Sequence, residues 1–249
     1  MPKVIAIHSY RGGTGKSNLT ANLAASMAAT GKRVAVVDTD IQSPGIHTLF
    51  GLEDTEGLRT LNDYLWERCP ILEAAREVTP ASLAGDGRVW LVPSSLKAAE
   101  IAKVLREGYD AGLLNDGFRD LMDDLALDYL LIDTHPGLNE ETLLSIAVSD
   151  ELVILIRPDR QDFQGTAVTV EVARRLGVKG LVMVLNKVLP LVSERGFPAE
   201  VERAYNAPVI GILPESHDML ELGSSGLFSL RFPDHPLSQA IRGVASRLA

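Results

Sequence analysis

A glycine-rich segment close to the N-terminus has the residue types of a phosphate-binding loop. Residues 11–17 read RGGTGKS, between the apolar run Lys3–His8 and the helix-forming segment Ser17–Thr30. Glycines allow backbone N–H groups to turn toward an anion, and the N-terminus of the following helix adds positive potential. Lys16 is expected to reach the β- and γ-phosphates of a nucleotide, and Ser17 to ligate Mg²⁺. The predicted nucleotide contacts of this loop are Gly12, Gly13, Thr14, Gly15, Lys16, Ser17 and Asn18.

Three aspartates lie at or just beyond the ends of two other apolar runs. The run Arg33–Asp38 ends with Asp38, and Asp40 follows two residues later. Carboxylates at this spacing lie on the same side of a strand end, which here is the side of the loop's mouth. Asp133 ends the run Asp128–Asp133. An acid in that position is typical of the Walker B arrangement, which holds Mg²⁺ through water.

The strict phosphate-loop pattern requires Gly at position 10, where this chain has Tyr10. The deviant form, in which a basic residue precedes Gly-Gly-x-Gly-Lys-Ser, does match. In this feature the sequence resembles the ParA/MinD family of dimerising P-loop ATPases. The resemblance implies that Asp38 lies in the water shell of Mg²⁺ and that Asp40 orients the attacking water. It also implies that the basic residue, usually lysine, crosses the dimer to the partner's nucleotide; Arg11 occupies that position. The implied catalytic residues are therefore Lys16, Asp40 and Arg11, and the implied metal residues are Ser17, Asp38 and Asp133.

Two departures from the family pattern leave alternatives open. Because arginine is longer than lysine and forked, another basic residue is an alternative source of the trans contact, and Arg157 and Arg160 are the candidates. The other reading of each is a surface arginine without a role in the site. The family usually continues Asp-Thr-Pro-Pro after the Walker B acid, whereas His135 follows Thr134 here. His135 either donates a hydrogen bond near a γ-phosphate or is a loop histidine satisfied by its neighbours.

The later apolar runs are expected to hold the base. Asn186 and Lys187 end a run as in Asn-Lys-x-Asp nucleotide pockets, but position 189 is leucine. The aspartate that would select guanine is therefore missing, which favours ATP over GTP. Pro214 and Glu215 follow another run and resemble the family's loop that lines the adenine. The predicted ligands are thus ATP and Mg²⁺.

Charge and cysteine content restrict the partners and the compartment. The chain of 249 residues has a net charge of −9. Residues 1–150 carry 13 Lys/Arg and 22 Asp/Glu, whereas residues 151–249 carry 11 of each, so only the latter part has room for a basic patch. The one cysteine, Cys69, excludes an internal disulfide, and iron–sulfur carriers of this fold need at least two thiolates per chain. Without a signal peptide or a membrane-length apolar run, the expected location is the cytoplasm, with nucleoid association left open.

The elements that must position these residues alternate between strand and helix. Apolar runs without polar alternation indicate strands buried on both faces of a parallel sheet. We therefore predict an α/β fold with a doubly wound, mostly parallel sheet of about seven to eight strands, in one domain spanning residues 1–249. Residues 53–87 do not follow the alternation of strands and helices. They predict a small helical insertion, with helices at Leu58–Arg68 and Ile71–Val78. The C-terminal segment Pro236–Ala249 has few basic residues and a small-residue apolar face, which predicts a docked core helix and argues against membrane binding. The expected strands are Lys3–His8, Arg33–Asp38, Arg88–Pro93, Asp128–Asp133, Glu151–Arg157, Gly180–Asn186 and Pro208–Leu213, and the main expected helices are Ser17–Thr30, Ala98–Glu107, Asn139–Val148, Gln164–Leu176 and Gly196–Tyr205.

The resemblance implies a slow ATP hydrolase that a partner stimulates. Such a protein would form an ATP-dependent homodimer, bind a small activator or adaptor protein and position or partition a cargo: a chromosome or plasmid, a division-site regulator or a protein microcompartment. Weak nonspecific DNA binding is compatible with the neutral C-terminal part. The alternative is a ligase or synthetase of the same fold that uses ATP to activate a small-molecule carboxylate.

Overall fold

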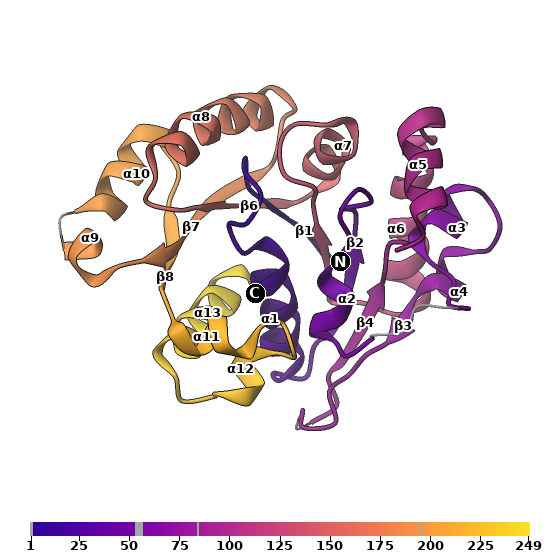
Figure 1. Cartoon of the computed structure of the whole chain (residues 1–249), viewed down its shortest axis with the longest axis horizontal. Helices are drawn as coiled ribbons and strands as arrows, with labels where there is room; N and C mark the ends of the chain where they lie inside the picture. Colours follow the sequence, from indigo (N-terminus) through magenta and orange to yellow (C-terminus); the bar gives the residue numbers. More distant parts are fainter. Residues whose placement is uncertain (1, 53–56, 84, 195) are drawn as a thin grey trace.

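The computed structural model of the chain describes residues 2–52, 57–83, 85–194 and 196–249. Its centre is an eight-stranded sheet in the order β3-β4-β2-β5-β1-β6-β7-β8 (Figure 1). Neighbouring strands are parallel, except that β3 pairs antiparallel with β4. The α/β fold with a mostly parallel sheet is therefore confirmed. The strands are β1 (Lys3–His8), β2 (Arg33–Asp38), β3 (Arg76–Glu77), β4 (Arg88–Val92), β5 (Tyr129–Asp133), β6 (Glu151–Ile156), β7 (Gly180–Val188) and β8 (Val209–Pro214).

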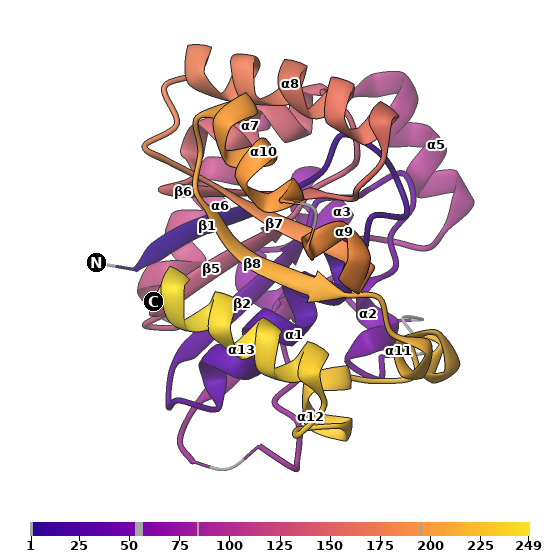
Figure 2. The same ribbon diagram turned by 90° about the vertical axis from the view of Figure 1, so that its left-hand side faces the viewer.

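Helices cover both faces of the sheet, so the central strands are buried on both sides (Figures 1 and 2). Ile5 and Ile7 of β1 belong to the core shared with α1 and α13, whereas Val4 and Ala6 belong to the core on the opposite face. That opposite core includes residues of α6, α7, α8 and α10. This double burial explains why the runs lack polar alternation. The helices are α1 (Lys16–Ala28), α2 (Ile46–Leu49), α3 (Leu61–Leu65), α4 (Ile71–Ala74), α5 (Ala98–Glu107), α6 (Ala111–Asp124), α7 (Glu140–Val148), α8 (Arg160–Arg175), α9 (Pro190–Glu194), α10 (Phe197–Tyr205), α11 (His217–Leu222), α12 (Phe228–Arg231) and α13 (Pro236–Leu248).

The region predicted as a helical insertion differs in part from the expectation. Residues 53–56 and 84 of the predicted segment 53–87 lie outside the described residues. Helix α3 falls within Leu58–Arg68, but the helix predicted over Ile71–Val78 is wrong beyond Ala74. Arg76 and Glu77 instead form β3 opposite Leu91 and Trp90, because backbone pairing with the sheet edge satisfies their polar groups.

The C-terminal helix α13 docks on the molecule, as predicted. It lies along α1 and β8 (Figure 2), and its apolar residues Leu237, Ile241, Val244 and Leu248 are buried. Its apolar face is thus already covered by protein. Among the residues that the structure describes, no helix is long and apolar enough to cross a membrane.

Candidate nucleotide-binding site

The glycine-rich loop connects β1 to α1 and is held by its own side chains and by β7. Gly15 caps α1 in the left-handed region, with φ 98° and ψ 22°, and Gly13 has φ 71°. The Thr14 hydroxyl donates to Ser9 Oγ at 2.7 Å, and Ser9 Oγ donates to the Arg11 carbonyl at 2.7 Å. Positive φ at both glycines curls the loop over the start of α1, as a phosphate cradle requires.

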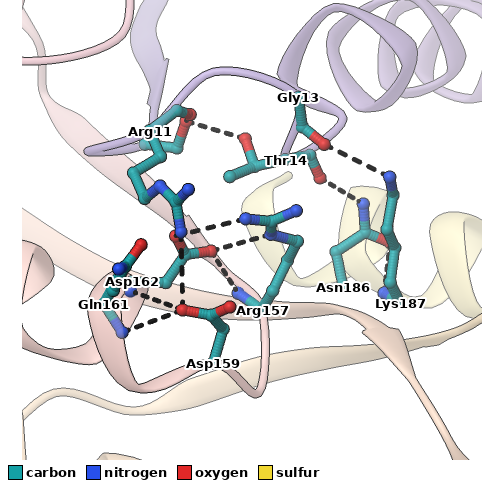
Figure 3. Close-up of polar contacts among 10 residues, drawn as sticks. Arg11, Gly13, Thr14, Arg157, Asp159, Gln161, Asp162, Asn186 and Lys187 are labelled. Carbon is teal, nitrogen blue, oxygen red and sulfur yellow. Dashed lines mark hydrogen bonds and ion pairs between the residues drawn. The ribbon is translucent and has the colours of Figure 1, made fainter.

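Two β7 residues predicted to lie near the base also contact the loop (Figure 3). Asn186 Nδ2 donates to the Thr14 carbonyl at 2.7 Å, and Lys187 Nζ donates to the Gly13 carbonyl at 3.2 Å. A Cβ at Gly15 would lie only 2.6 Å from Asn186 Nδ2. Gly15 is therefore required both by its backbone conformation and by the approach of Asn186.

Tyr10, which replaces the first glycine of the strict pattern, packs on α8. A Cβ added at Gly165 would overlap the Tyr10 ring. Gly165 is buried in the middle of α8, and Tyr10 remains 40% exposed. The missing loop glycine is thus accompanied by a helix glycine that makes space for the aromatic ring.

Asp38 and Asp133 are brought together by the sheet. They end the neighbouring strands β2 and β5, where they face each other in register, and both are buried. Burial raises the pKa of Asp38 well above its ordinary value, and the charges of Asp133 and Asp40 raise it further. Burial also raises the pKa of Asp133 to about 6, although hydrogen bonding from Ser17 and Thr20 and the charge of Lys16 oppose the shift. Two buried carboxylates at this spacing favour a cation between or beside them.

The predicted metal residues fit Mg²⁺ by their chemistry. Asp38 Oδ2 is buried without a hydrogen-bond partner, while Ser17 supplies a hydroxyl beside Asp133. Within the described part of the chain, no three His, Cys, Asp or Glu side chains gather in a metal-binding group. Mg²⁺ usually retains waters and takes one or two carboxylates plus phosphate oxygens, so this small oxygen-donor set suits it. When bound, Mg²⁺ would neutralise charge on the β- and γ-phosphates.

Lys16 lies at the base of the loop among these acids. It is buried. Burial lowers the pKa of its ammonium, and the charges of Asp133, Asp40 and Asp38 oppose that shift. An ammonium placed between carboxylates and the anion-binding loop is suited to hold a phosphate.

Asp40 lies at the mouth of the site. Its Oδ1 accepts hydrogen bonds from the Ser43 backbone N–H at 3.1 Å and from Ser43 Oγ at 3.0 Å. The Nε2 atom of His135, from the loop after β5, is 3.8 Å from the same oxygen. Asp40 therefore closes a local turn, and His135 approaches it from the neighbouring strand end.

Arg11 points toward Asp159 and Asp162 at the start of α8, on the side of the loop away from Asn186 and Lys187 (Figure 3). Its Nη1 is 3.5 Å from Asp159 Oδ1 and 3.7 Å from Asp162 Oδ1. Arg157 holds the buried Asp162 with two contacts, Nε to Oδ2 at 2.9 Å and Nη2 to Oδ1 at 3.4 Å. Of the two alternative arginines, Arg157 is thus committed to Asp162, and Arg160 is exposed at the first turn of α8.

A cavity of about 310 Å³ opens beside the loop and collects the predicted base residues. Its lining includes Asn18, Asn186, Lys187, Pro214 and Glu215, together with Gly13 and Gly15. Its apolar wall was not predicted, because Met219 and Leu220 lie on the short helix α11 and Leu237 and Ile241 on α13. Thr20 is a further site residue that was not predicted, and its hydroxyl donates to Asp133 Oδ1 at 3.3 Å. The one signal in the sequence that could have revealed it is its position three residues after Ser17, on the same face of the helix.

Strand, glycine loop and helix, with carboxylates at two neighbouring strand ends, define a P-loop nucleotide-binding protein. An AAA-domain family model matches residues 2–179. The ATP-binding protein MJ0547 of Methanocaldococcus jannaschii is 30% identical over 249 residues, which covers 100% of this chain and 88% of the relative. The chain belongs to the ParA/MinD-like family of ATP-binding proteins.

Other relatives are described with different functions. The cytosolic Fe-S cluster assembly factor CFD1 of Chaetomium globosum is 28% identical, covering 96% of this chain and 82% of the relative. The septum site-determining protein MinD of Pyrococcus horikoshii, complexed with Mg-ADP, has a TM-score of 0.82 at 22% identity over 100% of this chain and 96% of that one. MinD in the MinC:MinD complex of Aquifex aeolicus has a TM-score of 0.82 at 23% identity over 99% and 95%. The likeness to these structures is one of fold.

Proposed function

We propose that this protein is a slow ATPase that forms an ATP-dependent homodimer and thereby positions or partitions a cellular cargo. The observation that carries the proposal is the direction of Arg11. Its guanidinium lies against Asp159 and Asp162, its side chain is 38% exposed, and Arg11 does not line the chain's own base cavity. A basic residue on a phosphate loop that faces outward is suited to a nucleotide held by a second subunit.

The charges around Arg11 allow its side chain to leave Asp159 and Asp162 and contact a second subunit. Asp162 is buried, so it needs at least one cationic partner to avoid an uncompensated charge. Arg157 already contacts both oxygens of Asp162, and Asp159 accepts hydrogen bonds from the backbone N–H groups of Gln161 and Asp162. Arg11 can therefore leave this cluster without leaving either carboxylate unpartnered.

ATP and Mg²⁺ are the proposed ligands. The paired acids, Lys16 and Ser17 supply what a Mg²⁺-bound triphosphate needs, and a relative of this fold is described in complex with Mg-ADP. Hydrolysis would end the dimeric state. A partner that prefers the dimer would be bound and released in the same cycle, because a ligand shifts a conformational equilibrium only by its differential affinity.

Cysteine content favours a positioning role over cluster assembly. Cys69 is the only cysteine of the chain, and it is buried between α3 and α4. Burial raises the pKa of its thiol, which disfavours the thiolate that an iron–sulfur cluster needs. These properties of Cys69 disfavour a role in iron–sulfur cluster assembly.

The proposed partners are a second copy of the chain and a small activator protein, with the cytoplasm as the location. Membrane binding through α13 is disfavoured because its apolar face packs on α1 and β8. Nonspecific DNA is the cellular surface to test for binding by the dimer, since residues 151–249 carry balanced charge.

The decisive experiment uses Asp40→Ala protein in light scattering with ATP and Mg²⁺. A stable dimer is expected, because binding is retained while hydrolysis is blocked. Lys16→Ala, which removes the phosphate contact, is the matched control and should remain monomeric. A monomer in both proteins would refute the switch, and turnover that requires a small carboxylate would indicate the ligase. Repeating the measurement with nonspecific DNA tests whether the dimer binds DNA.

A further inference from the structure

We propose that His135 is a catalytic residue, the second acceptor beside Asp40 for the water that attacks the γ-phosphate. This inference rests on the proposed ATPase function. It begins with strand pairing: Asp40 follows β2 and His135 follows β5, two neighbouring strands. The Thr39 backbone N–H donates to the Asp133 carbonyl at 2.9 Å and ties the two strand ends together.

The imidazole of His135 is fixed with a defined face toward Asp40. Its Nδ1 lies 2.6 Å from the Pro136 carbonyl oxygen. A carbonyl only accepts hydrogen bonds, so Nδ1 carries a proton, and in the tautomer protonated there Nε2 presents its lone pair. The Thr142 hydroxyl donates to the His135 carbonyl at 3.1 Å and anchors the loop to α7.

The contact between His135 and Asp40 joins two acceptors. Nε2 and Asp40 Oδ1 are 3.8 Å apart, which is beyond hydrogen-bond distance. Ser43 already donates twice to Oδ1, so Oδ2 is the carboxylate oxygen left to accept. A molecule with two donors satisfies both groups at once, and water is the smallest such molecule. Both side chains are partly exposed, at 20% for His135 and 15% for Asp40, so water can reach them.

The pair also lies close to the phosphate end of the site. The loop after β5, which carries His135, packs on the start of the phosphate loop. The Gly137 backbone N–H donates to the Ser9 carbonyl at 3.4 Å, and a Cβ added at Gly12 would lie 3.9 Å from Pro136 Cγ. Lys16 is the residue expected to hold the γ-phosphate. A water between Nε2 and Asp40 therefore lies on the side of the site where the phosphate loop begins.

The chemical step balances without any further reagent. The water oxygen bonds to the γ-phosphorus while the bond from that phosphorus to the β–γ bridging oxygen breaks, and its electron pair stays on ADP. During the attack the two water protons are hydrogen-bonded to Nε2 and to Asp40, which fixes the direction of the water oxygen. One of these protons then passes to a γ-phosphate oxygen, so that inorganic phosphate leaves with both protons.

The test compares His135→Leu with His135→Gln in steady-state ATP hydrolysis, alongside ATP binding and dimer formation. Glutamine places an amide oxygen near the position of Nε2, so it keeps an acceptor for the water. We expect kcat to fall about 100-fold in the leucine variant, as for a misplaced reactant, and about 10-fold in the glutamine variant. The KM for ATP, the ATP affinity and the ATP-dependent dimer should change less than twofold.

Two results would overturn the role of His135. One is a leucine variant whose kcat stays within threefold of the parent. The other is a loss of ATP affinity equal to the loss of turnover in both variants, which would indicate a structural role. The parent protein separates this failure from that of the proposed function: if it neither binds nor hydrolyses ATP, the ATPase itself is refuted.

Discussion

The contact between Tyr10 and Gly165 predicts a substitution whose effect changes sign with its background. Replacing glycine by alanine inside a helix stabilises it by about 1 kcal/mol. In Gly165→Ala, however, the new methyl group would overlap the Tyr10 ring. Overpacking of this kind costs about 1–3 kcal/mol, so the net effect is expected to lie between neutral and about 2 kcal/mol of destabilisation. In Tyr10→Ala protein the same substitution should stabilise by about 1 kcal/mol.

Urea unfolding of the four proteins of this cycle gives the coupling free energy directly. The expected coupling is about 1–3 kcal/mol, and the Tyr10→Ala background should show Gly165→Ala raising Tm by about 2–4 °C. Gly243→Ala is the matched control, because Gly243 lies within α13 and an added Cβ there meets nothing within 4 Å. Equal stabilisation by Gly165→Ala in both backgrounds would refute the packing argument.

Three further substitutions test the site. His8 is buried, and burial lowers its pKa from 6.5 to about 3, so the unfolded chain takes up a proton first and stability falls as pH drops below 6.5. His8→Asn should flatten that fall by about 1 kcal/mol per pH unit between pH 6 and 4 in urea unfolding; an unchanged slope would contradict the shift. Gly15→Ala should weaken ATP binding in a fluorescence titration, and less so in an Asn186→Ala background, where the 2.6 Å approach is gone; equal losses would exclude the clash. Asp162→Ala should lower unfolding free energy by about 1–3 kcal/mol, less than for a fully buried pair because Arg157 is 24% exposed. A change below about 0.5 kcal/mol would show that Arg157 relaxes into solvent.

Elements with a strong local signal could be predicted from the sequence. The strand runs were found because burial on both faces leaves them continuously apolar. Strand β3 was missed because two residues carry no periodicity, and its pairing depends on β4. Helix α6 was missed because glycines and acids mask its pattern. One of them, Gly117, is explained by Tyr64, which lies 2.7 Å from where its Cβ would be.

The residues of the candidate site also divide into those that could be predicted from the sequence and those that could not. The loop and the aspartates could be predicted because each has a local pattern at a strand end. The facing of Asp38 and Asp133 could not, since it requires the strand order β2-β5-β1. Arg11 and Asp159 are 148 residues apart, and the cavity wall around Met219 depends on where α11 docks. Such contacts depend on tertiary packing, which has no local sequence signal.

The register between β2 and β5 has a consequence for the evolution of the site. Because Asp38 and Asp133 face each other across one strand spacing, the separation of their backbones is set by sheet hydrogen bonding, about 4.8 Å, and not by the choice of rotamer. A one-residue insertion in either strand would turn its aspartate to the opposite face of the sheet. The surrounding loops can therefore vary widely in sequence while the two carboxylates stay at a fixed spacing, and the tolerance for insertions ends at these two strands.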